Sequence, residues 1–375
     1  MELLNDEAYM RLALQMAEKA KGQTGVNPVV GCVIVKDGRI VGLGAHLQRG
    51  SHHAEIHALH MAGDDAADST VYVTLEPCTV HGRTPPCADR LIAERVSRVV
   101  VACADPNPRV SGAGIQKLRE HGIRVDVGVL EREAKRLNEA FHKYITTRMP
   151  FVTMKTACTL DGKIAARSGD SKWVSGEEAR AVVHTLRHQH QAIMVGVDTV
   201  IADNPRLTAR LPVPALQPVR LVVDSKLRIP LDAHVVKARD AKTIVLTTQQ
   251  ASIEQMMRLN GCGVEVIRCG DGPKVDLRLA MQTLADREIG SILLEGGGKL
   301  NGAMLKAGLI DKVVLFVAPK IVGGPSPSAF EFPGFERMAD AIRLDDVTVE
   351  RIGDDCCIVG YPKYERSDSP CSPES

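Results

Sequence analysis

The sequence has few aromatic residues, almost no net charge and no long apolar run. Aromatic residues make up 3% of the chain, and the net charge is +1 at pH 7. Proteins that bind single-stranded nucleic acid need basic grooves and aromatic stacking surfaces, so this composition argues against a nucleic-acid partner. No stretch reaches the roughly 20 apolar residues that a membrane-spanning helix requires. We therefore expect neither nucleic acid nor a membrane as a partner.

The N-terminal residues also lack the pattern of a secretory signal. They include Glu2, Asp6 and Glu7 and contain no apolar core segment, so we expect a cytoplasmic protein. In that reducing compartment the ten cysteines are not expected to form disulfides. Most of them are expected to be small buried side chains, but Cys78 and Cys87 differ from the rest in their surroundings.

The length of 375 residues exceeds that of a typical single domain. Helical and strand-like patterns alternate through the chain, beginning with a helix over 5–21, a hairpin that turns at Asp37–Gly38 and a helical stretch over 131–147. A second alternating series begins at Phe151. We predict two α/β domains, 1–147 and 148–364, of which the first is a three-layer sandwich with a largely parallel sheet, and a disordered tail over 365–375.

In the second domain the same patterns predict six strands and three helices. The strands are expected at 151–157, 193–196, 220–224, 243–246, 291–295 and 312–318, and the helices at 177–190, 276–286 and 299–307.

Three side chains in the first half are suited to binding zinc. His53 opens a helical segment, Cys78 follows a strand-like run, and Cys87 comes nine residues later. One imidazole and two thiolates would leave a fourth tetrahedral position for water. Glu55 is then placed to move protons between that water and a leaving amino group. The pattern is that of zinc deaminases, His-x-Glu followed by Pro-Cys-x-x-Cys, with a longer second part.

Other interpretations remain open for these residues. A single histidine is commonly a surface residue and a single cysteine a buried thiol, and His52, His57 and His60 are neighbouring rivals to His53. A second hypothesis is a nucleic-acid base deaminase with an appended non-catalytic α/β domain, which tight, salt-sensitive binding to tRNA or single-stranded DNA would support. A third is a structural zinc site, which would need a fourth protein ligand.

The segment Gly82-Arg83-Thr84-Pro85-Pro86-Cys87 makes a family resemblance specific. Residues 1–145 resemble the cytidine-deaminase-like domain of the bifunctional riboflavin-biosynthesis deaminase–reductases. The resemblance implies zinc on His53, Cys78 and Cys87, with Glu55 as the proton shuttle. It also implies a diaminopyrimidinone substrate that carries a ribosylamino phosphate and loses the amino group at position 2. The implied substrate contacts are Asn27, His46, Arg83, Asp105 and Asn107.

Two observations bear on these implied substrate contacts. Without the resemblance, Asn27 and the stretch 105–108 read as turns. The family usually has a histidine where this chain has Val80, so one substrate hydrogen bond is altered here.

In the second half, Glu295-Gly296-Gly297-Gly298-Lys299 joins an apolar strand to a helical pattern. Glycines permit close approach of a ligand, and the N–H groups at a helix start bind anions. A flexible turn is the alternative interpretation.

Residues 151–361 resemble the dihydrofolate-reductase-like domain of the same family, through Leu160–Lys163, Ser171–Trp173, Asp198–Thr208, Val223–Ser225 and Glu295–Gly298, in the family's order. The resemblance implies that NADPH reduces a ribosyl group to ribityl. It places along the cofactor Ala157, Trp173, Thr199, Asp203, Ser225, Gly297, Gly298, Lys299, Leu300, Asn301, Gly302 and Ala303. It places at the sugar phosphate Ser171, Arg187, Leu207, Arg210 and Glu295.

The chemistry of some of these residues agrees with that role, because guanidinium groups such as those of Arg187 and Arg210 bind phosphate by paired charged hydrogen bonds. Taken alone, Arg187 would be assigned to a solvated helix face and Trp173 to a core. Lys155 and Asp203 are further candidates near hydride transfer. We therefore predict a bifunctional enzyme, a zinc-dependent hydrolase and NADPH-dependent oxidoreductase, that forms a homo-oligomer, either a dimer or a tetramer.

Overall fold

The computed structural model describes residues 4–79, 85–107 and 111–364. The chain divides into two compact units, residues 1–151 with 284–290, and 152–283 with 291–375. The expected tail, 365–375, lies outside the described residues, as do Val80 and Arg83. Within the described parts, no helix combines the length and the apolar character needed to cross a membrane.

The first unit is built on a five-stranded sheet in the order β2-β1-β3-β4-β5. Its strands are β1 (Gly31–Lys36), β2 (Arg39–Ala45), β3 (Thr70–Val73), β4 (Arg98–Val101) and β5 (Arg124–Val127). The predicted hairpin is confirmed, and Asp37 and Gly38 both have the positive φ that a tight hairpin turn requires. Strands β3, β4 and β5 run parallel, whereas β1 is antiparallel to both of its neighbours. The expected largely parallel sheet is therefore correct for only part of it.

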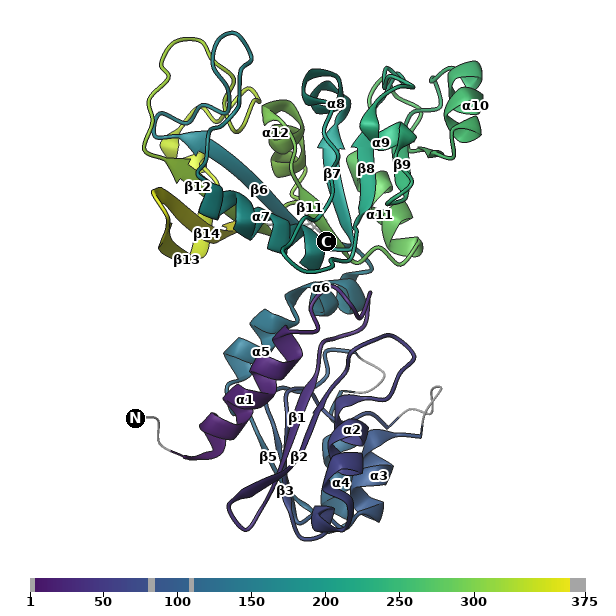
Figure 1. Cartoon of the computed structure of the whole chain (residues 1–375), viewed down its shortest axis with the longest axis vertical. Helices are drawn as coiled ribbons and strands as arrows, with labels where there is room; N and C mark the ends of the chain where they lie inside the picture. The colour runs from purple at the N-terminus through teal and green to yellow at the C-terminus, as the bar shows by residue number, and fades with distance from the viewer. Residues whose placement is uncertain (1–3, 80–84, 108–110, 365–375) are drawn as a thin grey trace, which may run out of the picture. The chain divides into compact units, whose positions relative to one another are not determined.

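Helices cover both faces of this sheet and confirm the three-layer prediction (Figure 1). One face carries α1 (Asp6–Glu18) and α5 (Glu131–Leu137), and the other carries α2 (Ala54–Ala62), α3 (Cys87–Ala93) and α4 (Ala113–Glu120). The helix expected over 131–147 is interrupted at Asn138, and α6 (Glu139–Thr147) follows. The buried Asn138 side chain explains the break, because its amide group bonds both the N–H and the carbonyl of Val29, at 2.9 Å each.

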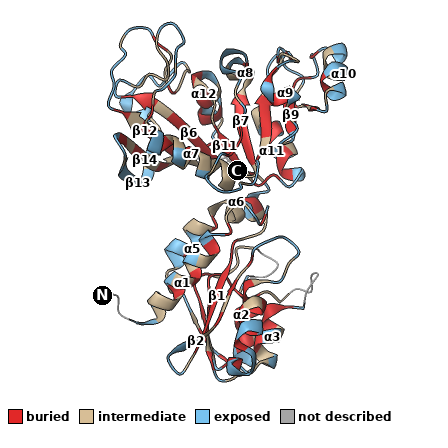
Figure 2. Ribbon diagram, viewed as in Figure 1, coloured by how far each residue is buried: buried red, intermediate tan, exposed pale blue. Residues whose placement is uncertain are grey.

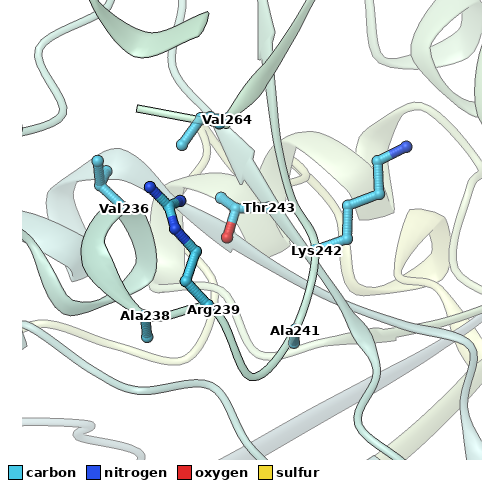
Figure 3. A pocket seen from close by; sticks show the side chains of 8 residues that line it. Val236, Ala238, Arg239, Ala241, Lys242, Thr243 and Val264 are labelled. Carbon is cyan, nitrogen blue, oxygen red and sulfur yellow. The ribbon is translucent and has the colours of Figure 1, made fainter. Parts of the chain in front are cut away.

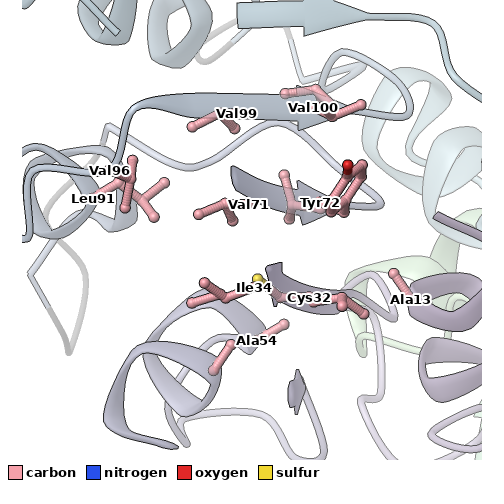
Figure 4. Close-up of a cluster of buried hydrophobic side chains, with 14 of the residues drawn as sticks. Ala13, Cys32, Ile34, Ala54, Val71, Tyr72, Leu91, Val96, Val99 and Val100 are labelled. Atoms are coloured by element: carbon pink, nitrogen blue, oxygen red, sulfur yellow. The ribbon is translucent and has the colours of Figure 1, made fainter. Parts of the chain in front are cut away.

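The core of the first unit lies between the sheet and its helices. Valines of the central strands, including Val71, Val99 and Val100, pack together with Cys32 and Ile34 of β1 (Figure 4). All five are completely buried. Runs of β-branched residues without polar alternation are typical of strands covered on both faces, which explains why these strands could be recognised from the sequence.

The second unit contains a nine-stranded sheet in the order β10-β9-β8-β7-β11-β6-β12-β14-β13. Its strands are β6 (Phe151–Thr159), β7 (Ala192–Gly196), β8 (Val219–Val223), β9 (Thr243–Thr247), β10 (Glu265–Arg268), β11 (Ser291–Leu294), β12 (Lys312–Ala318), β13 (Arg343–Ile352) and β14 (Asp355–Lys363). Its helices are α7 (Glu177–Gln189), α8 (Val197–Asp203), α9 (His234–Lys237), α10 (Ile253–Gly261), α11 (Leu277–Asp286) and α12 (Gly298–Lys306). Figure 2 shows that strands such as β7 and β8 are buried along most of their length.

The strand order of this sheet defines where a ligand can bind. After β6 the chain passes to β7 and adds β8, β9 and β10 outward, then returns to place β11 between β7 and β6. The direction of strand addition therefore reverses between β7 and β11. In open α/β sheets, ligands bind beyond the carboxyl ends of strands at such a reversal. Helices α8 and α12 begin directly after β7 and β11.

Candidate functional sites

Three side chains far apart in the sequence meet in the first unit. His53 immediately precedes α2, Cys87 is the first residue of α3, and Cys78 lies in the segment after β3. The His53 Nδ1 atom is 3.2 Å from the Cys87 sulfur and 3.5 Å from the Cys78 sulfur. Over the described ranges, these are the residues whose ligand atoms gather within 4.8 Å as a metal site requires. The geometry fits a zinc ion with three protein ligands.

The electrostatics of the two thiols also suit a metal. The pKa of Cys78 is lowered to about 4, first by a hydrogen bond from the Cys87 thiol and also by His53. The pKa of Cys87 is raised, because it keeps the proton that the two sulfurs share. Thiolates are the form of cysteine that binds zinc. One sulfur of this pair, that of Cys78, is therefore already a thiolate before the metal binds.

Glu55 lies in the first turn of α2 and is only 3% exposed. Its Oε2 atom has no hydrogen-bond partner among the described residues. Burial raises the pKa of Glu55 to about 7. A buried carboxylate oxygen without a partner is costly, and a carboxyl group with a pKa near neutral both takes up and releases protons efficiently. These are the properties of a proton shuttle.

His46 is buried beside the three ligand residues, with its ring centre 5.3 Å from that of His53. Its Nδ1 atom lies 3.3 Å from the carbonyl oxygen of His52. Because a carbonyl only accepts, Nδ1 carries the proton and Nε2 is an acceptor. The Nε2 atom is buried and has no partner in the described part of the chain. Burial lowers the pKa of His46, so the ring offers a substrate a neutral acceptor.

Glu76 was not singled out from the sequence, although it directly precedes Pro77-Cys78. Its carboxylate accepts four backbone N–H groups, from Asp105, Gly112, Gly114 and Ile115, at 2.8–3.4 Å. Glu76 is buried, and such a fourfold acceptor orders the surrounding chain. It therefore links the Cys78 segment to the predicted substrate residues that follow β4.

Among those predicted substrate residues, Asp105 and Asn107 form a turn. The Asp105 side chain accepts the N–H of Asn107 at 2.8 Å, and burial raises the pKa of Asp105. Asn27 also ends a turn, in which its carbonyl accepts the Thr24 hydroxyl. The turn interpretation is thus correct for both segments, and a turn leaves a side chain able to contact a ligand. Arg83 lies outside the described residues.

In the second unit, the start of α12 provides an open anion site. Gly297 precedes the helix with no side chain capping its N–H groups. A Cβ atom at Gly297 would meet nothing closer than the Thr199 hydroxyl, at 3.9 Å. Uncapped N–H groups at a helix start bind phosphate. This arrangement fits one phosphate of NADPH between the predicted residues Gly297 and Thr199.

The neighbouring residues Gly298 and Gly302 are glycines for a different reason, which is close packing of the chain. A Cβ atom at Gly298 would lie 2.3 Å from the Ser328 carbonyl oxygen, and one at Gly302 would lie 2.6 Å from that of Glu331. These two residues are glycine because the chain packs closely there. Asn301 is completely buried, and its Oδ1 atom has no partner among the described residues.

Other predicted cofactor residues lie at the surface around this edge of the sheet. Trp173 is 63% exposed, with the Arg180 guanidinium 4.7 Å above its ring. Its assignment to a core is therefore wrong. Exposed or half-buried positions are also found for Ala157, Asp203, Ser225, Lys299, Leu300 and Ala303.

A buried charged cluster lies next to this edge. The Arg187 guanidinium donates to both carboxylate oxygens of Glu295, at 2.6 and 2.8 Å. The two side chains are 14% and 10% exposed, so the solvated interpretation of Arg187 is wrong. Burial alone would raise the pKa of Glu295, but Arg187 and then Lys155 lower it to about 2. Burial lowers the pKa of Lys155. Glu295 is thus a permanent negative charge that faces two cations.

The remaining predicted sugar-phosphate residues are divided between core and surface. Leu207 is 3% exposed and packs in the core, so only its backbone can reach a substrate. Arg210 donates to the Thr208 hydroxyl at 3.1 Å. Burial lowers the pKa of Arg210, and the charges of Arg187 and Arg206 lower it further. A cluster of three guanidinium groups is suited to an anion. Ser171 is half-buried near Trp173.

A separate cavity of about 250 Å³ lies away from these residues (Figure 3). It is lined by residues at the amino-terminal ends of β9 and β10, including Thr243 and Val264. In Figure 3 the Arg239 side chain lies between Val236 and Thr243, whereas Lys242 points away. Because β7 to β10 are parallel, this cavity is at the edge of the sheet opposite to the predicted cofactor residues.

Comparisons with known proteins identify both domains. Residues 4–103 match the cytidine and deoxycytidylate deaminase zinc-binding region, and residues 150–358 match the RibD C-terminal domain. The chain is 45% identical to the riboflavin biosynthesis protein RibD of Aquifex aeolicus, over 96% of this chain and 99% of that protein. It is 41% identical to RibD of Escherichia coli strain K12, over 95% and 99% of the two chains.

Solved structures give the same result. The structure of Acinetobacter baumannii RibD superposes with a TM-score of 0.86 at 38% identity, covering 96% of this chain and 99% of that one. A Thermotoga maritima diaminohydroxyphosphoribosylaminopyrimidine deaminase/5-amino-6-(5-phosphoribosylamino)uracil reductase superposes with a TM-score of 0.84 at 36% identity, with the same coverage. With a zinc-binding deaminase domain and an NADPH-dependent reductase domain in one polypeptide, the chain belongs to the RibD family of bifunctional riboflavin-biosynthesis enzymes.

Proposed function

We propose that the first unit removes the 2-amino group of 2,5-diamino-6-(ribosylamino)-4(3H)-pyrimidinone 5′-phosphate. The second unit then reduces the ribosyl group of the product, 5-amino-6-(5-phosphoribosylamino)uracil, to ribityl. The observation that carries the proposal is the convergence of His53, Cys78 and Cys87 beside buried Glu55, whose Oε2 atom has no hydrogen-bond partner among the described residues. The reductase half is supported by the charged cluster at the predicted sugar-phosphate site.

In the deaminase, His53, Cys78 and Cys87 hold zinc, which supplies Lewis acidity and lowers the pKa of water to about 7. Glu55 accepts a proton from the attacking water and delivers it to the amino nitrogen, which leaves carbon 2 as ammonia. Its pKa of about 7 suits both transfers. His46 accepts a hydrogen bond from the pyrimidine through Nε2, and Asp105 and Asn107 position the rest of the substrate.

In the reductase, the residues around the start of α12 would hold NADPH, which would supply the hydride that reduces C1′ of the ring-opened imine. Reduction of the imine also requires a proton on the nitrogen. Lys155 is the donor that we propose, because it is half-buried on β6 near Glu295 and desolvation lowers its pKa. A lysine with a lowered pKa is a stronger acid than one in water. Asp203 is at the exposed end of α8 and is the weaker candidate.

The test supplies the diaminopyrimidinone ribosyl phosphate to the zinc-loaded enzyme and measures ammonia release, followed by NADPH oxidation. We expect both, in that order, and expect Lys155→Met to remove only the second. Absence of both reactions would overturn the proposal. Turnover of cytosine or adenine in single-stranded DNA or tRNA would instead favour the nucleic-acid hypothesis.

We also propose that the enzyme works in the cytoplasm as a homo-oligomer. No disulfide joins the nine cysteines in the described part of the chain, which suits a reducing compartment. The outer strand of the nine-stranded sheet, β13, has almost every residue exposed, including Val347 and Val349. Edge strands of this kind pair readily with another chain. Light scattering of the purified protein tests the assembly, and Val349→Lys should weaken it.

A further inference from the structure

One face of helix α7 holds the loop that carries Arg210. Residues 204–218 connect α8 to β8 and contain no helix or strand. We call residues 208–217 the Arg210 loop. Loops of this length inside compact domains are uncommon and are often functional, so the contacts that fix the loop also determine where Arg210 lies.

Two histidines of α7 accept backbone hydrogen bonds from the Arg210 loop. The Arg210 N–H donates to His184 Nδ1 at 3.2 Å, and the Leu216 N–H donates to His188 Nδ1 at 3.1 Å. Positions four residues apart lie on the same face of a helix. The two rings therefore hold the beginning and the end of the loop against α7.

The loop also closes on itself, which makes these two contacts act together. The Gln217 side chain accepts the Ala209 N–H at 3.0 Å and donates to the Ala209 carbonyl at 2.9 Å. Arg187, between the two histidines, donates to the Thr208 carbonyl at 3.1 Å. A loop closed in this way moves as one body, so releasing either histidine contact displaces Arg210.

The partners of the two rings determine their protonation state. A backbone N–H can only donate, so both Nδ1 atoms must be unprotonated and both rings neutral. The pKa of His184 is lowered to about 4, first by burial and then by the charges of Arg187 and Arg210, while Glu295 acts in the opposite direction. His184 is therefore a neutral acceptor at neutral pH. Protonation of His184 Nδ1 would place its N–H against the backbone N–H of Arg210, so that two donors would face each other. It would also add a positive charge beside the Arg210 side chain.

We propose that His184 and His188 are positioning residues of the reductase, which hold the Arg210 loop against α7 so that Arg210 meets the substrate phosphate. The inference rests on the proposed function, because it requires Arg210 at the phosphate. Neither histidine contacts the substrate in this role. The reacting C1′ is at the other end of the sugar, so the effect falls on substrate binding.

The experiment measures steady-state kinetics of the reductase step with the full-length, zinc-loaded enzyme, NADPH and the phosphorylated deaminated intermediate. The double variant His184→Ala/His188→Ala should raise KM about tenfold and change kcat less than about twofold. The double variant His184→Asn/His188→Asn should restore KM, because the Asn oxygen occupies the place of Nδ1 and accepts the same N–H. Thr185→Ala, on the exposed side of α7, is the control and should match the unaltered enzyme.

Acid provides an independent measurement. The neutral ring of His184 is favoured in the folded protein, so its contact is complete near the ordinary histidine pKa of 6.5 and is lost as the pH falls through about 4. The KM of the unaltered enzyme should therefore rise over this range more than that of the Asn variant. The substrate phosphate changes its charge with pH in the same way for both enzymes. The ratio of their two KM values therefore reports the effect of the histidines alone.

Arg210→Ala distinguishes a failure of this inference from a failure of the proposed function. An unchanged KM in Arg210→Ala would show that the phosphate binds elsewhere, and the proposed function would need revision. A raised KM in Arg210→Ala with no effect of the His→Ala pair would overturn the inference alone. Equal impairment of the Ala and Asn pairs would also overturn it. In the Arg210→Ala background, the His→Ala pair should add no further increase.

Discussion

In each unit one glutamate combines burial with a shifted pKa, and the two shifts are opposite. Glu55 in the deaminase has a pKa raised to about 7 because burial is not offset by a nearby arginine or lysine. The side chain of Glu295 in the reductase is 10% exposed, and Arg187 and Lys155 lower its pKa to about 2. Burial alone therefore does not define a role. One carboxylate is prepared to exchange a proton, and the other is a fixed charge that orients cations.

The two sites also differ in what they are made of. The metal centre consists of three specific side chains, each at or near the start of a helix or the end of a strand. The reductase site that we propose draws on backbone N–H groups at α12, an exposed tryptophan and a long loop. A metal requires particular donor atoms, whereas a dinucleotide and a sugar phosphate require an extended surface. The following predictions test this difference between the two sites.

The largest effect is expected from removing a zinc ligand. Cys87→Ser should lose zinc and all measurable ammonia release, because oxygen replaces a thiolate in a three-ligand site. NADPH oxidation with the deaminated intermediate should persist. Metal analysis of the purified variant checks this, with Cys103→Ser, a buried cysteine outside the group, as the control. Full zinc in Cys87→Ser would remove Cys87 from the site.

Glu55→Gln should keep zinc and lose ammonia release by about a thousandfold, since general acid–base catalysis contributes roughly 10²–10⁴. The amide cannot take up the proton. Single-turnover ammonia assays with matched zinc content measure the loss, and the exposed Glu133→Gln is the control. If Glu55→Gln retains normal turnover, another group carries the proton.

Glu295→Gln tests whether Glu295 acts as a fixed negative charge for Arg187 and Lys155. The variant leaves Arg187 and Lys155 buried without their counter-charge, which typically costs about 3 kcal/mol of stability. Because the pKa of Glu295 is lowered to about 2, its contribution is complete above the ordinary value of 4.5 and is lost as pH falls toward 2. Denaturant unfolding at pH 7 and near pH 3, followed by Trp173 fluorescence, should show a smaller difference between the two proteins in acid. An equal difference at both pH values would contradict the prediction.

Glu76→Gln tests the link between the metal segment and the substrate turn. An amide oxygen cannot accept four N–H groups as a carboxylate does, so we expect a loss of about 2 kcal/mol in the stability of the first unit, from charged hydrogen bonds. The KM for deamination should rise while zinc is retained. Hydrogen exchange at Gly112 and Gly114 would locate the effect, and unchanged protection there would refute the assigned role.

The smallest effect is expected at Trp173, the one tryptophan of the chain. Trp173→Phe should weaken NADPH binding by about threefold, because part of the aromatic contact remains. In the unaltered enzyme NADPH should quench the tryptophan fluorescence, which reports on the reductase alone. A titration without any quenching would place the cofactor away from Trp173.

Local chemistry allowed the metal centre and most elements to be predicted from the sequence. His53, Glu55, Cys78 and Cys87 form a short, ordered motif, and the buried strands appear as apolar runs. Strand β13 was not predicted, because most of its residues are exposed and the alternation of polar and apolar residues is confined to 346–350. The strands β5 and β10 were missed because charged residues interrupt their apolar runs, and the helices α8, α9 and α10 were also missed.

Only the tertiary structure decided which charges meet. The sequence by itself determined the donor atoms for zinc, the hairpin at Asp37–Gly38 and the glycines before α12, since each depends on chemistry within a few neighbouring residues. Two features join segments distant in the chain: the pairing of Arg187 with Glu295 and the four N–H groups on Glu76. Their physical cause is burial, which exists only after packing has excluded water and left each charge with a specific partner.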